Sequence, residues 1–293
     1  GTQSVREIGC FRFYDLGVDD DAWHFAAYCD NRELQVWRTD GTYEGTRAYG
    51  TINLVEGSSG FQAGLVSGGR DYLLVDNWPQ LQLWTADGLL GGTSLVATVS
   101  EEPLPVDTVF LVAAGGRLFF PGASADHGIE LWSSDGTAAG TGMVRDVFPG
   151  PGGSSPRAVP GAVLNGSLFF TGQSPDLGCQ LWASDGTYDG TRLVRNLLGG
   201  QDCSEPPLAV AALNGAVLFR GSDGPGRVGL WRTDGTPTGT EFLAPGLVDH
   251  VIGKVEGDLL YSSSSGVFRT DGTAGGTRGV RDLGSVSFVT GPG

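Results

Sequence analysis

The chain has 293 residues, of which 40% are apolar, and it contains 50 glycines and 15 prolines. That apolar share is enough for a hydrophobic core, so we expect a folded protein rather than a low-complexity chain. The net charge of −15 would repel a phosphate backbone and an anionic membrane surface, which argues against nucleic acid as a partner. No run of about 18 apolar residues is present, so no membrane insertion is predicted.

One phrase recurs through the chain. Its fullest copy is Glu-Leu-Trp at 130–132, followed after two residues by Asp-Gly-Thr at 135–137 and by a second Gly-Thr at 140–141. The aspartates of its six copies are Asp40, Asp87, Asp135, Asp185, Asp234 and Asp271. They are 47, 48, 50, 49 and 37 residues apart, and six units of that length account for nearly the whole chain. We therefore predict one repeat domain over 1–293, with units of roughly 9–50, 51–100, 101–148, 149–198, 199–245 and 246–283.

Each unit contains four runs typical of β-strands. In the fourth unit they cover 158–164, 167–171, 179–184 and 192–197, and Asn165-Gly166 between the first two is a strong hairpin signal. The Asp-Gly-Thr segment is predicted to turn the third strand into the fourth. Leu131 and Trp132 are adjacent, so they point to opposite faces of one strand, and both faces must be covered. Together these features predict an all-β fold, a six-bladed β-propeller with four antiparallel strands per blade and less than about 10% helix.

The phrase Glu-Leu-Trp-x-x-Asp-Gly-Thr resembles the ELWxxDGT-type repeat of large, mostly extracellular bacterial proteins. The lead-in His127-Gly128-Ile129-Glu130 is also similar to that family, and the resemblance covers nearly the whole chain. This sequence departs from the pattern at Leu89, Gly229, Gly266 and Phe268. The resemblance implies a propeller and a secreted or cell-surface location. It implies no established activity, and no functional residue is transferred from it.

The two ends of the chain hold surplus strand patterns. Residues 1–8 are similar to 140–147 and form a seventh copy of the fourth strand, whereas 285–290, within the terminal segment 284–293, is similar to a first strand. Either these strands pair at the seam of the ring, or the chain comes from a longer array. We expect six blades with a seam that uses at least one of them, and self-association through terminal strands is a related expectation.

The strand order places two types of loop on one side of the propeller, here called the upper face. They are the loops between second and third strands and the connections between repeat units. Cys10 and Cys29 fall at adjacent ends of a first and a second strand, and Cys179 and Cys203 also fall on the upper face. We predict the disulfides Cys10–Cys29 and Cys179–Cys203, and four buried thiols are the alternative.

Binding residues are expected on the upper face. Trp78 lies in an upper loop and either stacks on a sugar ring or anchors the loop. Polar residues near the starts of first strands either ring the channel mouth, where they would bind a sugar, a peptide or calcium, or are simply solvated: Gln62, Asp107, Arg157, Glu205 and Asp249. His24 and His250 replace apolar residues of other units and are either a site formed on ring closure or two core histidines. His127 belongs to the repeat and is expected to be structural.

No nucleophile or metal-binding signature is present, so no catalytic residue is assigned and the metal ligands are unknown. The leading prediction is a non-catalytic extracellular recognition or scaffold module that binds a glycan or a surface protein through the upper face. The first alternative is a propeller hydrolase or lyase with a divalent cation, such as calcium, in the central channel. The second is a structural subunit of a larger surface assembly.

Overall fold

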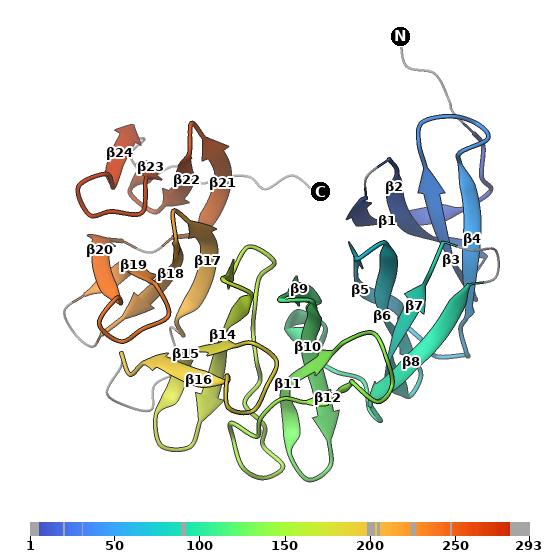
Figure 1. The fold of residues 1–293 in the computed structure, drawn as a ribbon, viewed down its shortest axis with the longest axis horizontal. Coiled ribbons are helices and arrows are strands. Elements are labelled where there is room, and N and C mark those ends of the chain that lie inside the picture. Colours follow the sequence, from blue (N-terminus) through green and yellow to red (C-terminus); the bar gives the residue numbers. More distant parts are fainter. Residues whose placement is uncertain are drawn as a thin grey trace. The chain divides into compact units, whose positions relative to one another are not determined.

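The computed structural model describes residues 6–19, 21–30, 32–88, 92–197, 203, 206–223, 227–246 and 248–281. The chain divides into two compact units, Gly1–Ser155 and Pro156–Gly293, and each holds three four-stranded sheets (Figure 1). The units are taken separately below, and the single domain over 1–293 stays a prediction.

The first unit, drawn from blue to green in Figure 1, contains three antiparallel meanders. Its first sheet consists of β1 (Phe11–Val18), β2 (Trp23–Asp30), β3 (Glu33–Thr39) and β4 (Arg47–Asn53). The second consists of β5 (Gly60–Ser67), β6 (Arg70–Asn77), β7 (Gln80–Ala86) and β8 (Thr93–Ser100). A short 3-10 helix, η1 (Val106–Thr108), precedes the third sheet, which consists of β9 (Val112–Ala114), β10 (Arg117–Ser124), β11 (Gly128–Ser134) and β12 (Gly142–Met143).

The second unit repeats this arrangement. The fourth sheet consists of β13 (Val163–Leu164), β14 (Ser167–Ser174), β15 (Gly178–Ser184) and β16 (Arg192–Arg195). The fifth consists of β17 (Leu208–Leu213), β18 (Ala216–Ser222), β19 (Val228–Thr233) and β20 (Glu241–Pro245). The sixth consists of β21 (His250–Val255), β22 (Asp258–Ser263), β23 (Gly266–Thr270) and β24 (Arg278–Arg281). Four antiparallel strands per repeat are thus confirmed, and no α-helix occurs among the residues that the structure describes.

The first strand of the fourth repeat is shorter than the predicted 158–164. Only β13 and an isolated bridge between Arg157 and Thr171 remain. Pro160 has no amide proton for the ladder, and the chain turns there, where the Ala162 amide donates to the Val159 carbonyl over 3.0 Å. Of the surplus terminal strands, 284–293 lies outside the described residues, as does 1–5, and residues 6–8 form no strand.

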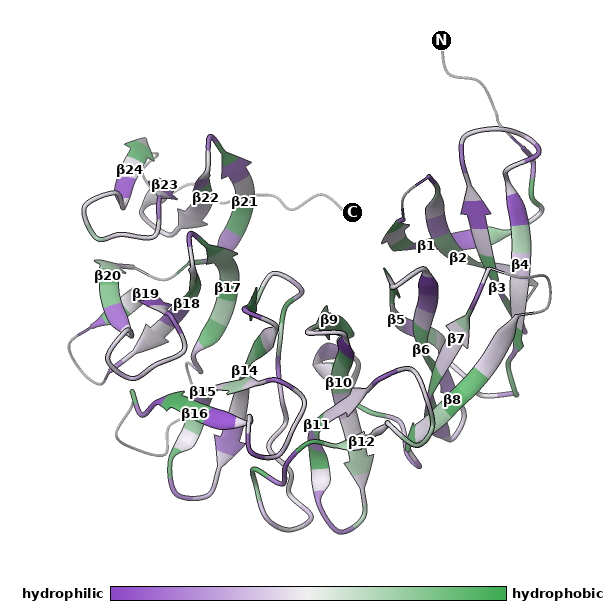
Figure 2. Cartoon of the chain, viewed as in Figure 1, coloured by the Kyte–Doolittle hydropathy of each residue, from purple (hydrophilic) through white to green (hydrophobic). Residues whose placement is uncertain are grey.

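Neighbouring sheets of one unit pack through opposite faces of the same strand. In β7, Leu83 belongs to an apolar cluster shared with the third sheet, where Phe120 and Trp132 lie, whereas Trp84 packs against the cluster of the first sheet. In the second unit, Leu230 and Trp231 of β19 likewise belong to two different apolar clusters, one on each side of their sheet. Green, apolar segments accordingly lie mainly along the strands in Figure 2. Both faces of these strands are covered, as the adjacent Leu-Trp pair predicted.

The Asp-Gly-Thr turn closes through side chains. In the third sheet, Oδ1 of Asp135 accepts hydrogen bonds from the Thr137 amide at 2.9 Å and from the Thr137 hydroxyl at 2.7 Å. The hydroxyl oxygen of Thr137 in turn accepts from the Gly140 amide at 3.0 Å. The same bonds recur at Asp40, Asp185, Asp234 and Asp271. These five aspartates therefore serve the turn, as predicted.

Candidate binding site

The hairpin between β6 and β7 carries a large aromatic side chain on the upper face. Trp78 is 51% exposed, and it precedes a cis peptide bond to Pro79. Its amide donates to the hydroxyl of Ser58 over 3.0 Å. The indole also lies against Gly57, where an added Cβ would lie 3.4 Å from the indole Cγ. The loop therefore holds Trp78 at one edge and leaves about half of its surface open to a ligand.

A frame of polar side chains surrounds this hairpin. Oδ1 of Asn77 accepts from the Ser58 hydroxyl at 3.2 Å. The carboxylate of Asp76 accepts from the hydroxyl of Ser59, and Nε2 of Gln62 donates to the same hydroxyl oxygen at 2.9 Å. Two residues that the sequence singled out separately, Gln62 and the tryptophan, are thus brought into one neighbourhood by the connection between the first two sheets.

That connection rests on a buried tyrosine of the first sheet. The Tyr28 hydroxyl accepts from the Phe61 amide at 2.9 Å and donates to the Ser59 carbonyl at 3.3 Å. Burial raises the pKa of Tyr28, so this hydroxyl stays protonated at neutral pH. Gly60 adopts a φ of +79°, and a Cβ there would lie 1.8 Å from the Tyr28 hydroxyl oxygen, so only glycine fits. The polar frame is therefore prebuilt rather than loose.

The other residues predicted near a channel mouth are placed as follows. In the first unit, Asp107 is exposed within η1. In the second unit, Arg157 and Asp249 are exposed and pair through their backbones with Thr171 and Ser262. His250 is exposed at the first position of β21, and Glu205 lies outside the described residues. Because these residues belong to two separate units, a common mouth stays a prediction.

His24 is buried and lies among acidic and phenolic groups of its own unit. Its Nδ1 is 2.9 Å from both Oδ1 of Asp71 and the hydroxyl of Tyr49, and its Nε2 is 3.1 Å from Oδ2 of Asp19. The Tyr49 hydroxyl also donates to the Asp71 carboxylate. Desolvation acts to raise the pKa of Asp19, but electrostatic interaction with His24 and hydrogen bonds from backbone amides outweigh it and leave that pKa lowered. The arrangement supports the alternative of a core histidine for His24, whereas His250 is exposed and is not one.

The partners of His24 escaped the sequence analysis, although one signal was present. Asp71 occupies the position in β6 that Leu118 and Leu168 occupy in β10 and β14, and it is 1% exposed. Burial raises the pKa of Asp71. A carboxylate in an apolar repeat position, near a histidine in another one, is the pattern that would have predicted this cluster.

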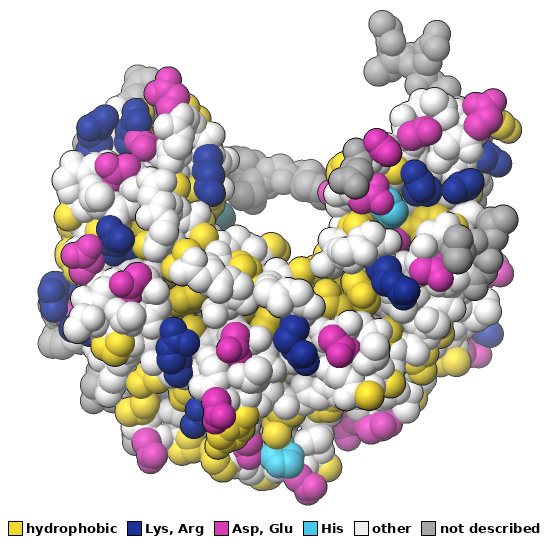
Figure 3. All heavy atoms as spheres, viewed as in Figure 1, with side chains coloured by type: hydrophobic (Ala, Val, Ile, Leu, Met, Phe, Trp, Pro, Cys, Tyr) yellow, Lys and Arg dark blue, Asp and Glu magenta, His cyan; other side chains and the backbone are white. Residues whose placement is uncertain are grey.

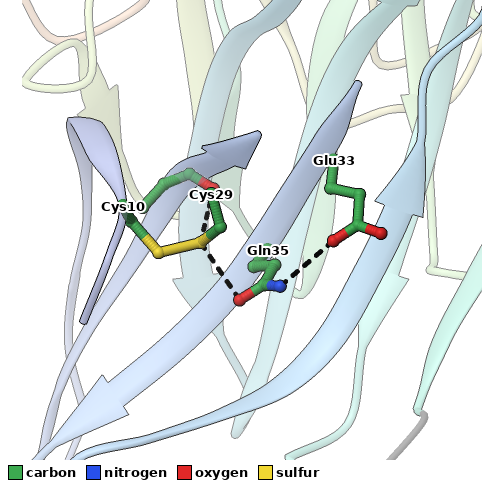
Figure 4. The surroundings of a disulfide bond; sticks show 5 residues. Cys10, Cys29, Glu33 and Gln35 are labelled. Carbon is green, nitrogen blue, oxygen red and sulfur yellow. Dashed lines mark hydrogen bonds between the residues drawn. A yellow bond between two sulfur atoms is a disulfide. The ribbon is translucent and has the colours of Figure 1, made fainter. Parts of the chain in front are cut away.

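Both predicted disulfides are present. Cys10 bonds to Cys29 of β2, and Figure 4 shows Gln35 beside this bond, with Oε1 3.1 Å from Sγ of Cys29. A disulfide sulfur has no proton to donate, so this approach is a contact rather than a hydrogen bond. Cys179 of β15 bonds to Cys203 in the connection that follows its sheet. Such bonds persist in oxidising compartments, which places the chain outside a reducing cytoplasm.

His127 contacts its own hairpin and a residue that follows β12. Its Nδ1 is 3.1 Å from the hydroxyl of Ser124, and its Nε2 is 3.8 Å from the carboxylate of Asp146.

Over the described ranges, no three His, Cys, Asp or Glu side chains are grouped to hold a metal ion. Acidic and basic side chains are interspersed over the face visible in Figure 3. Calcium therefore stays a prediction without a structural site.

Comparisons with known proteins relate the chain to several solved structures. No family model and no curated sequence matches it. The chain is similar to prolyl oligopeptidase B from Galerina marginata, with 11% identity over 93% of this chain and 44% of that chain, and a TM-score of 0.57. It is also similar to a prolyl endopeptidase, with 12% identity over 96% of this chain and 43% of that chain, and a TM-score of 0.55. The structure of a nidogen/laminin complex matches with 12% identity over 86% of this chain and 89% of that chain, and a TM-score of 0.41.

The six four-stranded sheets and the likeness to the two peptidase structures define the protein as a β-propeller, which confirms the predicted fold class. The chain spans less than half the length of the peptidases it matches, and identities this low establish the fold alone. Within the part of the chain that the structure describes, no helix has the length and apolarity to cross a membrane.

Proposed function

We propose that this protein is a non-catalytic, extracellular recognition module that binds a glycan, or alternatively a surface protein, through the upper face of its first unit. The observation that carries the proposal is Trp78, half exposed on a hairpin that Ser58 supports. Gln62 and Asp76 are bonded to the next residue of that connection, Ser59. A tryptophan offers a large, rigid apolar face at a low cost in conformational entropy. The C–H face of a sugar ring would stack on the indole, and sugar hydroxyls would pair with the neighbouring amide and carboxylate groups.

The rigidity of the frame supports this role. The Tyr28 hydroxyl fixes the connection at Ser59 and Phe61, and Ser58 fixes the hairpin, so little ordering is required when a ligand arrives. Preorganisation of this kind raises affinity mainly by lowering the entropic cost of binding. The two disulfides and the resemblance to ELWxxDGT-type repeats support a secreted or cell-surface location in a bacterium.

A glycan array probed with the wild-type chain and with Trp78→Ala tests this function. Tyr188→Ala is a matched control, because Tyr188 is 62% exposed on an Asp-Gly-Thr turn of the second unit, at the opposite end of its own sheet from the loop between the second and third strands. Loss of a central aromatic anchor typically weakens binding at least about tenfold. We expect that loss for Trp78→Ala and no change for Tyr188→Ala. Binding that survives Trp78→Ala, or that disappears with Tyr188→Ala, would contradict the proposal.

A further inference from the structure

A cleft of about 410 Å³ lies on the upper face of the first unit. Its walls are the connection Ser100–Leu104 that follows β8, the β10–β11 hairpin at Ala123–Ala125 and Gly128–Ile129, and Pro151. Ligand sites in proteins usually enclose roughly 300–1,000 Å³, so this space is large enough for a long side chain or a short peptide. All of the walls belong to one unit.

The lining of this cleft combines an apolar wall with an acidic edge. Pro103, Leu104 and Ile129 supply the apolar surface, and Glu101 and Glu102 supply the charge, with no lysine or arginine among the lining residues. Glu101 accepts a hydrogen bond from Gln80 at 2.8 Å. The Glu102 side chain is exposed, and among the described residues Glu102 is bonded only through its backbone, to Ser100. One carboxylate at the cleft is therefore available to a ligand.

The opposite wall is fixed by the glutamate of the repeat phrase. Glu130 is fully buried, and its Oε1 accepts from the amides of Phe148 and Ser154 at 2.9 and 3.0 Å. Its Oε2 accepts from the Ser154 hydroxyl at 2.5 Å. A Cβ at Gly128 would lie 2.5 Å from the carbonyl oxygen of Pro151, so the two segments touch through their backbones. The wall that carries Pro151 thus keeps its shape without a ligand.

We infer that this cleft binds the side chain of an arginine or lysine presented by a basic segment of a partner protein. Such side chains have an aliphatic stem that packs on apolar surface and a cationic head that pairs with a carboxylate. Here the stem would lie along Leu104 and Ile129, and the head would meet Glu102. The net charge of −15 also attracts a basic partner over longer distances. This inference does not rest on glycan binding at Trp78.

Two acetylated and amidated peptides, Gly-Ser-Arg-Ser-Gly and its analogue with citrulline in place of arginine, separate charge from shape. NMR titration of the full-length chain is the measurement, because it detects weak binding and locates it. We expect the arginine peptide to shift signals of residues 100–104 and 123–129, and the citrulline peptide to leave them unchanged. High salt should weaken the binding, since exposed charge pairs are screened.

The variant Glu102→Gln removes the charge with little change of shape and, as an exposed substitution, should leave the fold intact. We expect it to weaken binding of the arginine peptide by about fivefold, the upper range for a partly exposed ion pair. Glu44→Gln is the matched control, because Glu44 is an exposed carboxylate on an Asp-Gly-Thr turn of the same unit. Equal binding of both peptides, shifts confined to other acidic surfaces, an unchanged affinity in Glu102→Gln, or no binding at millimolar peptide would each overturn the inference.

Discussion

The carboxylate of Asp135 occupies the space that a side chain at Gly140 would need. A Cβ at Gly140 would lie 2.1 Å from Oδ1 of Asp135, far inside the contact distance of real atoms. The same clash, at 1.9–2.1 Å, recurs between the aspartate and the second glycine of the other described turns, at Gly45, Gly190, Gly239 and Gly276. The repeat phrase therefore pairs the two residue types because one side chain fills the place of the other.

This relationship predicts a coupled effect on stability. Gly140→Ala should lower the free energy of unfolding by about 1–3 kcal/mol, the usual cost of forcing extra atoms into a packed position. In an Asp135→Ala background the same change should cost much less, because the obstructing carboxylate is gone. Urea denaturation of the two single variants and the double variant measures the coupling. Strictly additive effects would show that the two residues do not compete for space.

The turn aspartates predict a loss of stability in acid. Hydrogen bonds from the Thr137 hydroxyl and amide hold the pKa of Asp135 below its ordinary value of 3.8, and the same cause acts at the other four described turns. Because the folded-state pKa is lowered, the stability that these carboxylates contribute is present above about pH 4 and is lost as the pH falls through the lowered values.

Asp135→Asn tests this directly, since asparagine keeps the acceptor oxygen and loses the titration. We expect the urea midpoint of the wild type to fall more steeply below pH 4 than that of the variant. Combining the change with Asp185→Asn and Asp234→Asn should make the urea midpoint depend still less on pH below pH 4. Identical acid limbs for all of these proteins would contradict the prediction.

Glu130 should tolerate glutamine and not alanine. In the fourth sheet, Gln180 occupies the equivalent position, and its Oε1 accepts from the Leu197 amide at 3.1 Å. Glu130→Gln keeps an acceptor for the amides of Phe148 and Ser154, whereas Glu130→Ala leaves these donors unpaired. We expect Glu130→Ala to cost about 3 kcal/mol in chemical denaturation.

The pH dependence of the glutamine variant gives a second readout. Burial raises the pKa of Glu130 above its ordinary value of 4.5, so the folded wild type binds this proton more tightly than the unfolded chain. The contribution of Glu130 to stability is therefore greatest below pH 4.5 and declines as the pH rises through the raised folded-state value. Glu130→Gln should lack this decline and be at least as stable as the wild type at pH 7. A loss as large as that of the alanine variant would show that the charge itself is required.

Truncation of Trp231 should lower the stability far more than truncation of Trp78. Trp231 is 1% exposed within the cluster between two sheets, and its Nε1 donates to the Gly221 carbonyl at 3.1 Å. Trp231→Ala should cost about 3–5 kcal/mol, as for other buried large aromatics. Trp78→Ala should change the stability by less than about 0.5 kcal/mol, because that side chain is half exposed. Comparable losses in thermal or urea unfolding would mean that Trp78 is part of the core rather than of a binding surface.

Features that the repeat determines within one unit could be predicted from the sequence. The spacing of the phrase, the adjacent Leu131 and Trp132, and the hairpin signal at Asn165-Gly166 were enough for strand number and strand order. The positions of the cysteines on those strands were enough for both disulfides. The short β13 escaped prediction because Pro160 interrupts a run whose composition is otherwise typical of a strand.

Contacts that depend on tertiary packing were harder to predict. Trp78 and Gln62 were each picked out, but their common frame depends on Ser58 and Ser59, whose residue types carry no functional pattern. The role of Glu130 was also hidden, because its partners lie 18 and 24 residues further along a connection without regular structure. Side chains that fix loops across such separations leave no local periodicity to detect.

The most direct test of recognition through the upper face is hydrogen–deuterium exchange, followed by mass spectrometry, of the chain with and without a glycan selected on the array. Exchange reports where a ligand shields the backbone. We predict slower exchange at residues 55–62 and 76–80, the connection and the hairpin that frame Trp78. Protection confined to the Asp-Gly-Thr turns, with none around Trp78, would contradict the proposed function.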